Sequence, residues 1–125
     1  MALKLKSREI DGVVVIDLIG RLTCGDPQIL FRETVRRLVD EGNGKLVLNL
    51  SEVNFVDSSG LGELVSTRHL MAERGGEVNL LGLAKKVKDL LVMTKLVTAF
   101  DCFEDEAKAV AALQTRRDAV RSMTS

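Results

Sequence analysis

Three side chains that can carry charge or accept a phosphoryl group follow one another at residues 57–59, within the stretch NFVDSSGLG. Asp57 precedes the hydroxyl residues Ser58 and Ser59, and Gly60 and Gly62 come directly after them. A serine at the start of a helix lies beside unpaired backbone N–H groups and the positive end of the helix dipole, which favour an anion. A phosphoryl group on such a serine adds about two negative charges. A phosphoryl group on one of these serines would therefore be well accommodated, and it would change the local field sharply.

The same residues are also typical of a plain helix start. Asp and Ser are preferred N-cap residues, so local composition alone favours capping, and one of the three is expected to cap the helix. One cap is enough, however, and neither serine has the Glu or Gln three residues later that completes a capping box. Gly60 and Gly62 each cost a helix up to about 1 kcal/mol relative to Ala, unless another group approaches the backbone closely. Two hydroxyls over such a bare backbone favour the docking of a partner.

Other chemistries that use such loops are incomplete in this chain. The stretch GLGELV (60–65) has two glycines of a dinucleotide-binding fingerprint, but Val65 occupies the third glycine position and no GxxxxGK[ST] loop is present. A phospho-receiver site at Asp57 would need further acids after an earlier strand and a lysine after a later one. The only histidine, His69, has no Ser, Asp or Cys arranged with it as a triad. A small enzyme or nucleotide-binding domain is therefore the disfavoured alternative.

Composition excludes several other classes of protein. The 125 residues carry a net charge of zero, with no Trp or Tyr and four Phe, so neither a basic surface nor a stacking platform favours nucleic acid. Cys24 and Cys102 lie far apart with no metal-ligand or disulfide spacing, which predicts reduced thiols, no metal and no cofactor. No stretch has the architecture of a signal peptide or the length of a membrane span. We expect a cytoplasmic protein.

The elements that position the serines follow from apolar periodicity and turn residues. Two strands, 2–10 and 13–20, are joined by an Asp11–Gly12 turn, and Gly20 ends the second. A helix capped by Asp26 runs to Gly42. Further strands are expected at 45–50, 77–83 and 98–103, with helices at 58–74, at 84–96 and from 104 onward. On the helix at 58–74, the buried face should carry Leu61, Leu64, Val65 and Met71, and Met93 should fill the core of the next helix.

Strands that alternate with helices define the fold class. The order predicts a single α/β domain over residues 1–125, with a mixed, mostly parallel sheet and about four helices mainly on one side. Residues from about 115 to 125 are expected to form a flexible tail. In open sheets of this kind, functional loops follow the carboxyl ends of the strands, and the serines lie at such a point.

With these elements placed, the sequence resembles a known family. The stretch KLVLNLSEVNFVDSSGLGELV, with GGEVNLLGL and KKVKDLLVMTKL after it, is similar to the bacterial anti-sigma factor antagonists, which have the STAS fold. The most specific element is D-S-S-G-L-G after an apolar strand. The resemblance covers most of the chain, from the second strand to the last helix.

The resemblance implies a non-enzymatic binding switch. In that family, the serine after the aspartate is phosphorylated by a partner anti-sigma factor that is itself a serine kinase, and here that residue is Ser58. The unphosphorylated protein would bind the anti-sigma factor and release a sigma factor. Phosphorylation would end that binding, and a PP2C-type serine phosphatase would restore it. Modification of Ser59 and a weak homodimer remain open.

The resemblance also implies a docking surface around Ser58. It would include Asp57 as the local acidic partner, together with Ser59, Gly60, Leu61 and Gly62. The loop GRLTCGD would join it through Arg21 and Thr23, the latter at a position where many relatives have an acid. The alternative to sigma-factor control is a STAS scaffold subunit of a larger signalling or transporter-associated assembly.

Overall fold

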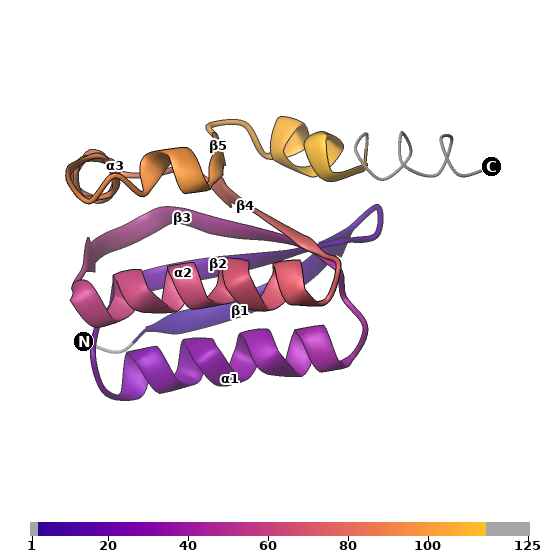
Figure 1. Ribbon diagram of the computed structural model, residues 1–125, viewed down its shortest axis with the longest axis horizontal. Coiled ribbons are helices and arrows are strands. Elements are labelled where there is room, and N and C mark those ends of the chain that lie inside the picture. The colour runs from indigo at the N-terminus through magenta and orange to yellow at the C-terminus, as the bar shows by residue number, and fades with distance from the viewer. Residues whose placement is uncertain (1–2, 115–125) are drawn as a thin grey trace.

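The structure, a computed structural model, describes residues 3–114 (Figure 1). Its elements are β1 (Lys4–Ile10), β2 (Val13–Leu22), α1 (Asp26–Asp40), β3 (Lys45–Val56), α2 (Ser58–Glu73), β4 (Glu77–Leu81), α3 (Lys85–Met93), the 3₁₀ turn η1 (Val97–Ala99) and β5 (Asp101–Phe103). Residues 106–114 are also helical. The tail expected at about 115–125 lies outside the described residues. None of the helices seen in the described range has the length and apolar character needed to cross a bilayer.

The described strands form one five-stranded sheet in the order β1-β2-β3-β4-β5. β1 and β2 are antiparallel and are joined by the expected tight turn, in which Asp11 and Gly12 both have positive φ. β2, β3, β4 and β5 are mutually parallel neighbours, so the connections between them carry helices or longer crossovers. The predicted mixed, mostly parallel sheet is confirmed.

The two faces of the sheet are covered unequally. Along β2, Val14, Ile16 and Leu18 point into a large core with the apolar faces of α1, α2 and α3. The intervening Val13 and Val15 point the other way, into a smaller core that the helical residues 106–114 cover. Figure 1 shows α1 and α2 lying side by side along the sheet. The helices therefore lie mainly on one face, as predicted.

Several predicted details of the elements are wrong. β2 does not end at Gly20 but continues to Leu22, because Gly20 adopts a φ of 116° at a register shift where an L-residue would be strained. The N-cap of α1 is Gly25, and Asp26 is instead the first helical residue, without a capping side-chain bond. Met93, which was expected in the core, is 79% exposed at the end of α3.

β3 is longer than the predicted strand at 45–50, and this extension positions the serines. Beyond the apolar run, the strand continues to Val56 because Phe55 and Val56 pair with Arg21 and Leu22 at the end of β2. The ends of β2 and β3 therefore lie side by side. The loops that follow these two strands leave the sheet together.

Candidate functional site

Asp57 is the N-cap of α2. Its backbone is extended, and its Oδ1 atom accepts a hydrogen bond of 2.8 Å from the backbone N–H of Gly60. The backbone N–H of Leu61 then donates to the carbonyl of Asp57 over 2.9 Å, which closes the first turn. Of the three candidate caps, the aspartate therefore does this work, and the two serines are not needed for it.

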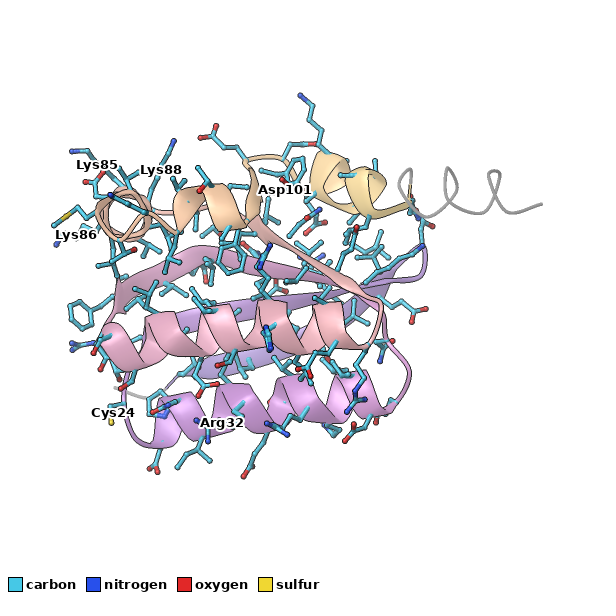
Figure 2. All side chains as sticks on the ribbon, viewed as in Figure 1. Cys24, Arg32, Lys85, Lys86, Lys88 and Asp101 are labelled. Carbon is cyan, nitrogen blue, oxygen red and sulfur yellow. The ribbon has the colours of Figure 1, made fainter. Side chains whose placement is uncertain are left out.

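Asp57 also binds the loop that follows β2. Its Oδ2 atom accepts a 2.9 Å hydrogen bond from the backbone N–H of Cys24, and its own N–H donates to the carbonyl of Leu22. The hydrogen bonds from Cys24 and Gly60 hold the pKa of the Asp57 carboxyl below its usual value, because they stabilise the charged form. Figure 2 shows Cys24 at the end of the fold where α1 and α2 begin. One carboxylate thus fixes both loops of the predicted docking surface.

Gly60 is a glycine because of this chain's own packing. It is buried, and a Cβ atom at this position would lie 2.1 Å from the carbonyl oxygen of Leu22. The close approach that the sequence indicated is therefore made by Leu22, and the buried Gly60 lies beneath the predicted docking surface. Gly62, in contrast, is exposed, and a Cβ there would meet nothing within 4 Å.

The two serines differ in accessibility. Ser58 is the first residue of α2 and is exposed, whereas Ser59 is half-buried. Leu61 is partly buried against the main core. Gly62, the next residue, is exposed beside the first turn. The Ser58 hydroxyl is thus presented to solvent at the positive end of a capped helix, where a phosphoryl group would be stabilised by the dipole.

Arg21 and Thr23 flank this turn from the end of β2. The Arg21 guanidinium carbon lies 4.7 Å from the ring centre of Phe55, so the exposed cation stacks on an exposed ring. Thr23 is half-buried, and its carbonyl accepts a 3.0 Å hydrogen bond from the N–H of Gln28 in the first turn of α1. Both residues therefore belong to the same end of the sheet as Ser58.

Sequence reasoning missed Glu63, a buried acid one turn beyond the serines. Its carboxylate accepts hydrogen bonds from Arg32, labelled on α1 in Figure 2, and from the Gln28 side chain at 3.0 Å. Burial alone would raise the pKa of the Glu63 carboxyl, but the bonds and the charge of Arg32 hold it below its usual value. This contact ties α1 to α2 behind the serine turn. The sequence holds no signal for it, because Glu63 does not share a helical face with Leu61, Leu64 and Val65, the apolar residues that indicate this helix.

The chemistry available at the turn is therefore that of an accessible hydroxyl and hydrogen-bonding backbone. Within residues 3–114, no cluster of three or more His, Cys, Asp or Glu residues is placed to hold a metal ion. Cys24 and Cys102 are both exposed free thiols. His69 is exposed on α2, with Glu73 one turn away.

Comparison with known proteins identifies the family. The family model of the STAS domain matches residues 4–109. The chain belongs to the STAS domain family. An anti-sigma F factor antagonist of Paenibacillus polymyxa is 28% identical over 117 residues, which cover 91% of this chain and 97% of that protein. The predicted resemblance is confirmed at the level of the family and of its antagonist relatives.

Solved structures show the same STAS fold. An anti-sigma factor antagonist from Mycobacterium paratuberculosis aligns with a TM-score of 0.79 at 19% identity, over 90% of this chain and 95% of that one. The Bacillus cell fate determinant SpoIIAA, in its phosphorylated form, aligns with a TM-score of 0.69 at 20% identity, over 89% and 98% of the two chains. At these identities the structural similarity shows that the fold is shared, and it shows no more than that.

Proposed function

We propose that this STAS protein is an anti-sigma factor antagonist that is switched by phosphorylation of Ser58. In the unphosphorylated state it binds an anti-sigma factor and thereby releases a sigma factor. The observation that carries the proposal is the exposed Ser58 hydroxyl at the first position of α2, in a turn that Asp57 has already capped. Ser58 can therefore be modified without loss of the cap.

The position of Ser58 supports a way in which its modification would release the partner. A phosphoryl group on Ser58 would be tolerated by the free protein, because it lies at the positive end of α2. In a closed interface the same dianion must lose its water and lie near the charge of Asp57. A penalty of about 3 kcal/mol would weaken binding more than about 100-fold. The switch would thus act on the complex and leave the fold intact.

The decisive experiment pairs the two serines. Anti-sigma factor serine kinases from the genome that encodes this chain are purified, and each is incubated with ATP and the wild-type, Ser58→Ala or Ser59→Ala protein. We expect one kinase to add a single phosphoryl group to the wild type and to Ser59→Ala, and none to Ser58→Ala, by intact-mass spectrometry. Equal labelling of Ser58→Ala would show that the assigned residue is wrong.

Binding tests the electrostatic part of the proposal. Ser58→Asp should bind the same anti-sigma factor more weakly than the wild type does. Ser58→Asn, which is similar in size to Ser58→Asp but neutral, should lose less affinity. A PP2C-type serine phosphatase should remove the phosphoryl group and restore binding. An affinity that is the same for all three proteins would contradict the switch.

A further inference from the structure

A pocket opens between the carboxyl end of β3 and the first turns of α3. Its volume is about 190 Å³, enough for a side chain of a partner to enter. Its lining consists of Asn54, Phe55, Val56, Lys86, Val87 and Leu90. The lining is therefore mostly apolar, with Asn54 and Lys86 as its polar members. We call this pocket the α3 groove.

The α3 groove adjoins the serine turn. Residues 54–56 form one wall, and Asp57 and Ser58 follow them directly in the chain. Phe55, which is 45% exposed, lines the groove and also stacks under Arg21. A partner that contacts Ser58 and Arg21 would therefore meet the groove as part of the same surface.

The segment that carries α3 is positively charged although the chain is neutral. Between residues 85 and 95 there are four lysines and one acid, Asp89, which gives a local charge of +3, so the rest of the chain carries −3. Figure 2 shows Lys85, Lys86 and Lys88 projecting from α3. This excess of cations fits an acidic partner.

The folding of α3 does not explain these lysines. Its N-cap, Ala84, makes no side-chain cap bond, and its first turn has no acid. Lysines at this end oppose the helix dipole, which favours acids there. The sequence thus keeps a feature that weakens the helix, on a surface with an open apolar pocket.

We propose that the α3 groove binds an acidic segment of the anti-sigma factor, with one apolar side chain of that segment seated between Phe55 and Leu90. This inference rests on the proposed function and assigns the partner a chemical character. Lys86 in the lining would pair with an acid of the segment, while Lys85 and Lys88 would attract it from a longer range. The interface would therefore extend from the serine turn onto α3.

The test is a titration of the anti-sigma factor that phosphorylates Ser58 against wild-type, Lys86→Glu and Lys108→Glu proteins. Lys108 is exposed on the helix that covers the opposite face of the sheet. Lys108→Glu therefore makes the same change of charge as Lys86→Glu, but far from the α3 groove. We expect Lys86→Glu to weaken binding about tenfold or more, equivalent to about 1.4 kcal/mol, and Lys108→Glu to bind like the wild type. Added salt should weaken the wild-type complex more than the Lys86→Glu complex.

The outcomes separate this inference from the proposed function. If the anti-sigma factor binds neither the wild type nor the variants, the proposed function fails. If Ser58→Asp loses binding but Lys86→Glu binds like the wild type, only the α3 groove assignment is wrong. Light scattering on the same samples tests whether a second copy of this chain occupies the groove. If Lys86→Glu changes self-association and leaves partner binding unchanged, the groove joins two copies of this chain and the inference is overturned.

Discussion

The helices α2 and α3 follow neighbouring parallel strands, yet their first turns are built in opposite ways. At α2, the Asp57 carboxylate caps the helix and binds the preceding loop. At α3, Ala84 provides no capping side chain, and Lys85, Lys86 and Lys88 lie within the first four residues. Acids stabilise such a position and cations destabilise it, because the dipole is positive there. The start of α2 is thus consistent with stability, and the start of α3 is not.

The difference separates the features that folding explains from those that it does not. The same contrast recurs inside α2 between its two glycines. Gly60 is required by the packing of Leu22, whereas Gly62 faces open space and weakens the helix without any structural return. Features that folding does not explain, namely Gly62, the Ser58 hydroxyl and the lysines of α3, all lie on the exposed surface at the carboxyl end of the sheet.

The largest expected effect comes from alanine at the two glycines. Gly60→Ala places a Cβ atom against the Leu22 carbonyl and should destabilise the protein by about 3 kcal/mol, because backbone must move on both sides. Gly62→Ala meets no atom and should stabilise it by up to about 1 kcal/mol. Urea unfolding of both variants measures the two free energies. If both substitutions change the free energy of unfolding equally, Gly60 is not required for packing in the way that distinguishes it from Gly62.

The next effect concerns the cap of α2. Asp57→Ala should lower the free energy of unfolding by about 1–2 kcal/mol at neutral pH, since it removes the acceptor of both backbone N–H groups. Asp57→Asn retains one acceptor oxygen but loses the charge, so its free energy of unfolding should fall by less than that of Asp57→Ala. Unfolding in urea at neutral pH checks this order.

The pH dependence of these variants has a definite sign. The folded-state pKa of Asp57 lies below its value of about 3.8 in the unfolded chain, so its charge stabilises the fold above that pH and stops doing so as pH falls through the folded pKa. The difference between wild type and Asp57→Asn should therefore be constant above about pH 5 and shrink in acid. A difference that grows in acid would contradict the assignment of the cap.

Much of the fold was predictable because it depends on local patterns. The apolar alternation of β2, the Asp11–Gly12 turn and the helical spacing in α1 each determine one element, and the alternation of strands and helices then determines the sheet. The position of the serine turn was predictable as well, since it directly follows an apolar strand. The family resemblance added the choice between Ser58 and Ser59.

The rest depends on contacts between distant residues. The hydrogen bond from Cys24 to Asp57 and the approach of Leu22 to Gly60 join segments more than 30 residues apart, so no local pattern could reveal them. Helical spacing also placed Met93 in the core, but α3 ends at this residue and its side chain is exposed. For the same reason the α3 groove, which needs β3 and α3 together, is visible only in the structure.

The smallest expected effect tests whether α3 is weakened by its own lysines. Lys85→Glu places an acid at the first residue of the helix, where the dipole favours it, and should raise the free energy of unfolding by about 0.3–1 kcal/mol at low salt. Lys85→Gln removes the cation without adding an acid and should gain less, so the two variants form a graded series. Thermal unfolding at low and high salt measures both, and salt should reduce the gain. If Lys85→Glu makes the protein more stable but weakens binding of the proposed anti-sigma factor, the lysines are retained for binding. If stability rises without a loss of binding, or does not rise at all, the contrast between α2 and α3 has no connection with binding.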